Sequence, residues 1–395
     1  MTARQATDRP TDPETPRPAT DRPTGPETPH PATDRPTTRS RDQRKDAVMS
    51  DGHAPDRATD DARPGMLSAR HVTKAFSGTG SRTAGDAAGT DDHRDRSIRR
   101  LARWFRSVTS ARPPVLDDIS FDLPLGQVHG LVGRNGVGKT TLLRIMAGQL
   151  CSSGTVSVDG RPVFDNPEVL GSLVLAGADV PLPRSYTVGR VLAVAARRWR
   201  TWDDDLATRL VRDFGLETRK KVSDLSRGQR SMVGIVTGLA AQAPVTLLDE
   251  PYLGLDVENR DLFYRHLLHD IGRNPRTVVM STHHIDDASR VLDSVMLMAD
   301  ATVREVVPVA DLTARMRVLT GSSVAVGRVC SALAVRGQGR ILLDDATGGA
   351  RRVTVDMAAA EAAGTLDGLA SDHGVRVTEP RLDHAVLALG AGERQ

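Results

Sequence analysis

Apolar residues from position 66 onward follow two alternating patterns. The runs LSARHVTKAF (67–76), VLDDISFDL (115–123) and VHGLVG (128–133) predict strands, and KTTLLRIMAGQL soon after them has the apolar spacing of a helix. Strands that alternate with helices are typical of a mainly parallel sheet whose two faces are both covered. The sequence therefore predicts an α/β domain over residues 66–315.

The same alternation continues toward the C-terminus. TVSVDG predicts a strand and a turn, residues 188–214 predict two helices with charged faces, and PVTLLDEP predicts a buried strand. A helix over 257–272, a strand at RTVVMSTHH, a short helix and a strand at SVMLM follow. Beyond them, residues 316–395 carry the strand-like runs RILLDDA and RRVTVDM and predict a small accessory domain.

Two segments depart from this pattern. Residues 1–65 contain a 13-residue repeat, ATDRPTDPETPRP followed by ATDRPTGPETPHP, which is too polar to bury a core and predicts a disordered tail. Residues 77–113 form a polar insertion that ends in SIRRLARWFRSV, a basic amphipathic helix with Trp104 and Phe105 on its apolar side. This helix could pack on its own domain, lie on the inner membrane surface or dock on a partner protein.

Composition narrows the class of protein. The chain has 3% aromatic residues, no apolar run of the ~18 residues that span a bilayer, and no secretory signal. Its two cysteines, Cys151 and Cys330, suggest neither a disulfide nor a metal framework, which favours a cytoplasmic protein. A net charge of +3 is too small to imply that the whole chain binds nucleic acid.

The segment GRNGVGKTT, between a predicted strand and a predicted helix, has the spacing of a phosphate-binding loop. Its glycines allow successive backbone N–H groups to point at phosphate oxygens, and the helix adds its positive end. Lys139 is expected to reach the β- and γ-phosphates, and the Thr140 hydroxyl to join the shell of a magnesium ion. The expected nucleotide-binding residues are Gly133, Arg134, Asn135, Gly136, Val137, Gly138, Lys139, Thr140 and Thr141.

Three further motifs follow at useful distances. VTLLDEP places Asp249 and Glu250 at the end of a buried strand, where Asp249 can hold Mg²⁺ and Glu250 can polarise the attacking water. LSRGQRS (225–231) offers a serine hydroxyl and a glycine backbone at the start of a helix, although serine is also a common helix cap. His283 follows the next predicted strand, where its imidazole can contact the γ-phosphate, although a lone histidine is more often structural.

The order of phosphate loop, LSRGQ, LLDEP, GLD and STH resembles the ATP-binding cassette (ABC) ATPases over about residues 66–300. The resemblance implies a P-loop NTPase fold with an antiparallel β subdomain and a helical subdomain at about 188–235, and binding of ATP and Mg²⁺. In this family two domains pair head to tail. Ser226, Gly228 and Gln229 would then complete the partner's ATP site, with Asp256 at the seam of a homodimer or of a pair with a second ATPase.

The sequence departs from the family pattern at three positions. Arg227 stands where the family usually has glycine, and the segment 172–188 lacks the expected glutamine. Asp179 is the nearest oxygen donor for that role, and a water molecule is the alternative. Phe76 takes the place of the aromatic residue, usually tyrosine, that stacks on adenine, and its phenyl ring can still stack.

A single cassette with a short C-terminal extension, together with DEPYLGLD and STHHIDDA, resembles the ATPase subunits of bacterial ABC-2 type exporters. The resemblance implies separate membrane-spanning subunits and a peripheral location at the cytoplasmic face of the cell membrane. The alternative is a soluble ABC ATPase with a mechanochemical role outside transport.

Overall fold

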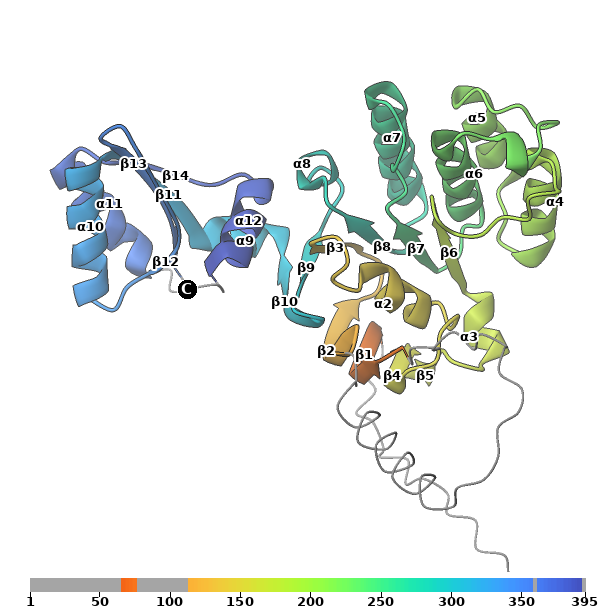
Figure 1. The fold of residues 1–395 in the computed structure, drawn as a ribbon, viewed down its shortest axis with the longest axis horizontal. Coiled ribbons are helices and arrows are strands. Elements are labelled where there is room, and N and C mark those ends of the chain that lie inside the picture. Colours follow the sequence, from red (N-terminus) through yellow and green to blue (C-terminus); the bar gives the residue numbers. More distant parts are fainter. Residues whose placement is uncertain (1–64, 77–112, 358–360, 393–395) are drawn as a thin grey trace, which may run out of the picture. The chain divides into compact units, whose positions relative to one another are not determined.

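The structure, a computed structural model of the chain, describes residues 65–76, 113–357 and 361–392 (Figure 1). All of them belong to one compact unit, Thr59–Gln395. The expected N-terminal tail lies outside the described residues apart from Gly65. The expected insertion lies outside them apart from its last residue, and so does its amphipathic helix. Both expectations therefore stay predictions.

A six-stranded sheet forms the centre of the described residues, in the order β10–β9–β3–β8–β7–β6. Its first five strands in chain order run parallel, and β10 is an antiparallel edge strand. Every residue of β7 and β8 is buried, as parallel strands covered on both faces require. The mainly parallel sheet predicted from the sequence is thus confirmed. Its strands are β3 (Val128–Gly133), β6 (Leu173–Gly177), β7 (Val245–Asp249), β8 (Thr277–Thr282), β9 (Ser294–Ala299) and β10 (Thr302–Pro308).

An antiparallel sheet of order β2–β1–β4–β5 accompanies the central sheet. Helix α2 (Lys139–Met146) contributes Leu142 and Met146 to the hydrophobic core that these two sheets share. Figure 1 shows α2 between them. The antiparallel β part implied by the ABC resemblance is therefore present. Its strands are β1 (Met66–Lys74), β2 (Leu116–Pro124), β4 (Ser153–Val158) and β5 (Arg161–Pro162).

Helices from the middle of the chain cover the other face of the central sheet. They contribute Val233, Phe263 and Leu267, among others, to a second core that also contains Val278 of β8. Most of these helices begin at a residue whose side-chain oxygen accepts a backbone N–H, and such a cap satisfies one of the free donors of the first turn. The helices of this region are α4 (Val188–Arg198), α5 (Asp204–Asp213), α6 (Arg227–Ala240) and α7 (Val257–Arg273), with a 3₁₀ turn at Val222–Asp224. Helix α3 (Pro167–Gly171) instead contributes Val169 to the core around α2.

The C-terminal region folds as β–α–β–β–α–β, with an antiparallel sheet of order β12–β13–β11–β14. This is the ferredoxin-like arrangement. Its core lies between the sheet and the two helices and includes Leu319, Val329, Val353 and Leu366. The sequence predicted only two of its strands. The elements are β11 (Met316–Ser322), α10 (Ser323–Val335), β12 (Arg340–Thr347), β13 (Ala350–Asp356), α11 (Glu361–His373) and β14 (Arg376–Thr378).

Helix α12 (Leu382–Gly392) joins this C-terminal sheet to the rest of the molecule. Its apolar side packs with α9 (Val309–Arg315), β12 and the short helix α8 (Ile285–Ala288). Leu382 and Val386 belong to the same core as the helices on the central sheet. In addition, the Arg381 guanidinium lies 3.1 Å from the Asp286 carboxylate of α8. The hydrophobic core therefore continues across the expected boundary at 315/316, and the division into two domains stays a prediction.

Candidate ATP site

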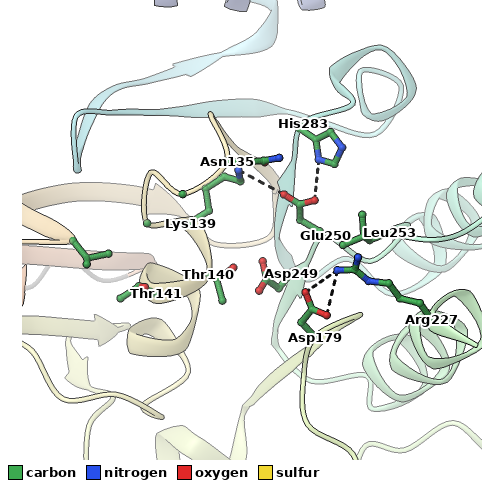
Figure 2. Close-up of a pocket in the computed structure, with 13 residues that line it drawn as sticks. Asn135, Lys139, Thr140, Thr141, Asp179, Arg227, Asp249, Glu250, Leu253 and His283 are labelled. Atoms are coloured by element: carbon green, nitrogen blue, oxygen red, sulfur yellow. Dashed lines mark hydrogen bonds and ion pairs between the residues drawn. The ribbon is translucent and has the colours of Figure 1, made fainter. Parts of the chain in front are cut away.

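A cavity of about 460 Å³ lies where β3, β6, β7 and β8 end (Figure 2). Because these strands are parallel, their carboxyl ends meet at one edge of the sheet, which is where α/β proteins bind ligands. The lining brings together residues that are far apart in the sequence. Its described residues are Val115, Asn135, Gly136, Gly138, Lys139, Thr140, Thr141, Asp179, Arg227, Asp249, Glu250, Leu253 and His283.

The loop between β3 and α2 favours glycine at two positions. Gly136 has φ 82° and Gly138 has φ 115°, in the region that residues with side chains rarely adopt. At Gly138, a Cβ atom would also lie 2.6 Å from the Leu116 side chain and 2.8 Å from the Val115 carbonyl oxygen. Gly138 is the N-cap of α2, so free N–H groups of the first helical turn face the cavity. This geometry suits the oxygens of a phosphate group.

Lys139 places a buried positive charge beside this loop. Its side chain is 5% exposed, and its Nζ donates hydrogen bonds to the carbonyl oxygens of Gly133 at 2.9 Å and Arg134 at 3.3 Å. The Glu250 carboxylate lies 3.6 Å away. A buried ammonium group needs such partners, and an incoming phosphate can replace them.

Asp249 and Thr140 form a pair of oxygen donors at the floor of the cavity. The Asp249 carboxylate accepts a hydrogen bond from Ser281 Oγ at 2.8 Å, and the Thr140 side chain lines the same cavity. Burial raises the pKa of Asp249, and the nearby hydroxyl groups of Ser281 and Thr140 oppose the rise. A bound cation would compensate the buried carboxylate, and carboxylate and hydroxyl oxygens are ligands that Mg²⁺ prefers. The donor set therefore fits a magnesium ion.

Glu250 lies between Lys139 and His283, as Figure 2 shows. Its carboxylate is 2.8 Å from Nδ1 of His283, and its own N–H donates to Ser281 Oγ at 2.8 Å. Its φ of 44° is in the left-handed region, which is uncommon for a residue with a side chain. Backbone strain of this kind occurs mostly at functional sites, where the surrounding structure imposes it.

Asp179 and Arg227 face each other on the same cavity (Figure 2). The Arg227 guanidinium lies 3.1 Å from one carboxylate oxygen of Asp179 and 3.4 Å from the other. Asp179 follows β6, in the segment where the ABC family pattern has a glutamine, and Arg227 is the first residue of α6. The structure thus brings together two of the three departures from the family pattern.

The other residues of the LSRGQ segment are outside the described lining of this cavity. Ser226 caps α6 in a reciprocal box with Gln229, in which each side chain binds the other residue's backbone N–H. Gly228 packs on the backbone of Gly254, where a Cβ atom would lie only 2.3 Å from the carbonyl oxygen. Asp256 caps α7 through the N–H of Asn259 at 2.9 Å.

Some expected nucleotide-binding residues also do not reach the described lining. Phe76 is half exposed, and its ring centroid lies 5.4 Å from the Lys74 ammonium. Gly133 and Arg134 act through the carbonyl groups that hold Lys139, and Val137 packs on the core around α2.

Sequence reasoning missed Ser281, which holds both Asp249 and the N–H of Glu250. It pairs with Asp249 in the register of the adjacent strands β7 and β8. The sequence signal that could have identified Ser281 is a residue with a side-chain hydroxyl at the end of the next parallel strand.

The chain is similar in sequence to known proteins. The sequence pattern of the family described as "ABC transporter" matches residues 116–253. The ABC transporter ATP-binding protein NatA of Bacillus subtilis is 30% identical over 197 residues, which cover 47% of this chain and 78% of NatA. The arabinose import ATP-binding protein AraG of Burkholderia pseudomallei is 34% identical, over 50% of this chain and 42% of AraG. A solved structure, "Structure of ATP binding subunit of ABC transporter", aligns with a TM-score of 0.48 and 21% identity, covering 62% of this chain and 91% of that one.

A phosphate loop, an Asp–Glu pair and a histidine on one cavity at the edge of a parallel sheet define a P-loop NTPase. The chain belongs to the ABC transporter ATP-binding proteins. The protein therefore binds ATP and is an ATPase, as its resemblance to the ABC ATPases implied.

Proposed function

We propose that this protein hydrolyses ATP in the cavity described above and thereby drives a substrate through separate membrane-spanning subunits, in the direction of export. The observation that carries the catalytic part is the position of Glu250, with Lys139 at 3.6 Å on one side and His283 at 2.8 Å on the other. A carboxylate held between two nitrogen groups at a phosphate loop is placed to accept a proton from the water that attacks the γ-phosphate.

Each residue of the site has a proposed role. Lys139 binds the β- and γ-phosphates, and the exchange of its present partners for phosphate oxygens releases Glu250 to bind water. Thr140 and Asp249 would hold Mg²⁺, which supplies positive charge to the phosphate oxygens when bound. His283 contacts the γ-phosphate and keeps Glu250 oriented through its Nδ1. Phe76 stacks on the adenine ring.

We propose that a second ATPase domain completes the site. Ser226, Gly228 and Gln229 lie at the start of α6 and are outside the described lining of their own chain's cavity. Asp256, just before the start of α7, is also outside the described lining of its own chain's cavity. In a head-to-tail pair these helix starts face the partner's phosphates, and the partner is a second copy of this chain or a related ATPase.

The direction of transport rests on the likeness to ABC-2 type exporters. The relatives include a protein named for arabinose import, so membership of the family leaves the direction open. Within the described residues, every helix is too short or too polar to cross a bilayer. On the likeness to ABC-2 type exporters, the proposed location is the cytoplasmic face of the membrane, with other chains as the spanning partners. The basic amphipathic helix predicted at 97–108 would add contact with the inner membrane surface.

Affinity purification of the full chain from detergent-solubilised membranes of its own cells tests the transport role. We expect a membrane protein with several hydrophobic spans to co-purify, and the ATPase rate of the complex to change when it is reconstituted in vesicles. Recovery of a fully active ATPase from the soluble fraction alone, with no membrane protein bound, would favour the mechanochemical alternative.

A further inference from the structure

Tyr252 connects the turn after β7 with the turn after β8. Its side chain is 1% exposed, and it lies outside the described lining of the ATP cavity. Its hydroxyl donates a hydrogen bond to Thr282 Oγ1 at 2.6 Å and accepts one from the backbone N–H of His283 at 2.9 Å. Glu250 and His283 already contact each other through their side chains. Tyr252 comes two residues after Glu250 and binds the backbone of His283, so its phenol is a second link between the two residues.

The ring of Tyr252 also packs on the histidine side chain. The ring centroids of Tyr252 and His283 are 5.8 Å apart, and that of His284 is 5.4 Å from Tyr252 in an edge-on arrangement. The Arg260 guanidinium lies 5.8 Å from the Tyr252 centroid. The ring therefore has neighbours that limit its movement, and the hydroxyl stays directed at the backbone of His283.

The phenol keeps its proton in this environment. Burial raises the pKa of Tyr252 above its usual value, although the hydrogen bonds around the hydroxyl oppose the rise. A neutral hydroxyl can donate and accept at the same time, which is the pattern that Thr282 and His283 require.

We infer that Tyr252 is a positioning residue, whose hydroxyl fixes the backbone of His283 so that the imidazole stays against Glu250. The inference rests on the role proposed above for His283 and Glu250 in ATP hydrolysis. Without the hydroxyl, the His283 N–H loses its partner, and the imidazole spends less time in the position that orients the carboxylate.

The chain provides a matched control for this hydroxyl. Tyr264 on α7 is also 1% exposed, but its hydroxyl has no hydrogen-bond partner among the described residues. Tyr252→Phe and Tyr264→Phe therefore remove the same atom from equally buried sites. We expect Tyr252→Phe to lower kcat for ATP hydrolysis about three- to tenfold with KM within about twofold, the scale of one lost hydrogen bond. Tyr264→Phe should leave both constants unchanged.

A double-mutant cycle with His283→Ala separates positioning from general packing. If Tyr252 acts through His283, Tyr252→Phe should change kcat by less than about twofold in the His283→Ala background. Losses that multiply in the double variant would overturn the inference and leave the role of His283 intact. If His283→Ala alone keeps full activity, the proposed role of His283 is wrong, and a loss in Tyr252→Phe then has another cause.

Stability measurements guard against a trivial loss of folded protein. The urea midpoints of Tyr252→Phe and Tyr264→Phe are compared, and kcat is expressed per folded molecule. If Tyr252→Phe does not fold, Thr282→Val removes the acceptor that orients the same hydroxyl, and with it the acceptor of the His284 N–H. A smaller fall in kcat that disappears in the His283→Ala background is then expected. An unchanged kcat in a folded Tyr252→Phe variant would overturn the inference.

Discussion

Arg227 and Asp179 form an ion pair on the wall of the ATP cavity, with 3.1 Å between the guanidinium and the nearer carboxylate oxygen. Their side chains are 52% and 64% exposed, so the pair adds little to the stability of the fold. Its importance is electrostatic, because the lining already contains the carboxylates of Asp249 and Glu250. Arg227 offsets a third negative charge at the place where the phosphates of ATP would bind.

The first prediction concerns this charge balance. Arg227→Gln leaves Asp179 without its cation and should raise KM for ATP about two- to fivefold, the scale of an exposed ion pair. Asp179→Asn in the same chain should restore KM, because the extra negative charge is then gone. The measurement is steady-state ATP hydrolysis at low and high salt, since salt screens the repulsion.

The matched control is Arg212→Gln, which breaks another exposed pair, with Asp213, outside the described lining of the cavity. It should have wild-type constants. If Arg227→Gln and the double variant have the same KM, Asp179 does not face the phosphates.

The second prediction separates binding from chemistry. Lys139→Ala should abolish ATP binding, because it removes the buried cation that meets the phosphates. Glu250→Gln should keep binding but lower turnover by a factor on the order of 10² or more, as expected when a positioned base is removed. Titration calorimetry with ATP and single-turnover hydrolysis measure the two effects. An equal loss of affinity in both variants would contradict the assigned roles.

The third prediction tests the head-to-tail pair. Glu250→Gln at saturating ATP should run as a dimer in gel filtration, because hydrolysis no longer separates the subunits. Adding Ser226→Asp should abolish this dimer, since its carboxylate would meet the partner's phosphates. Aspartate caps helices as well as serine does, so α6 should remain intact.

Ser226→Asn is the neutral control, because asparagine also caps α6 without adding charge. It should still dimerise with ATP. Dimers of equal stability in all three variants would place Ser226 away from the partner's nucleotide.

The fourth prediction concerns acid stability. His129 is fully buried, with Nδ1 2.7 Å from Ser294 Oγ and Nε2 2.8 Å from the Pro124 carbonyl oxygen. Burial lowers the pKa of His129 below its usual 6.5, against the raising effects of the Pro124 carbonyl and of Asp293. As the pH falls through 6.5, the unfolded chain takes up this proton first. The free energy of unfolding should therefore decrease from that pH toward the pKa of the folded protein, by at most ~1.4 kcal/mol per pH unit.

Urea unfolding between pH 7.5 and 5.5 measures this dependence. His129→Gln should weaken it, whereas His71→Gln, a change at an exposed histidine of β1, should retain the wild-type slope. Parallel slopes in all three proteins would show that His129 takes up its proton equally well in both states.

The central sheet and the main site residues could be predicted because their signals are local. The segment from Gly133 to Thr140 carries its own strand, loop and helix, and Asp249 and Glu250 directly follow a buried apolar run. By contrast, Asp179 and Arg227 are 48 residues apart, and only the packing of α6 beside β6 brings them together. No sequence pattern around Asp179 or Arg227 predicts that the two residues are in contact.

The C-terminal fold gave weaker signals for a different reason. Helix α10, SVAVGRVCSALAV, has apolar residues on most of its surface, so its periodicity does not separate a buried face from an exposed one. Strand β14 has only three residues, Arg376–Thr378, and is recognisable through its pairing with β11. These elements depend on contacts between distant segments.

The position of α12 has a consequence for synthesis of the protein. Leu382, Ala385 and Val386 share one core with Leu292 and Val307, which belong to the ATPase part of the chain. Domains usually fold from the N-terminus while the ribosome is still adding residues. Here the ATPase core lacks part of its apolar filling until α12 has left the ribosome. A chain that terminates before Leu382 would expose apolar surface on its ATPase part, which the cell's chaperones and proteases recognise.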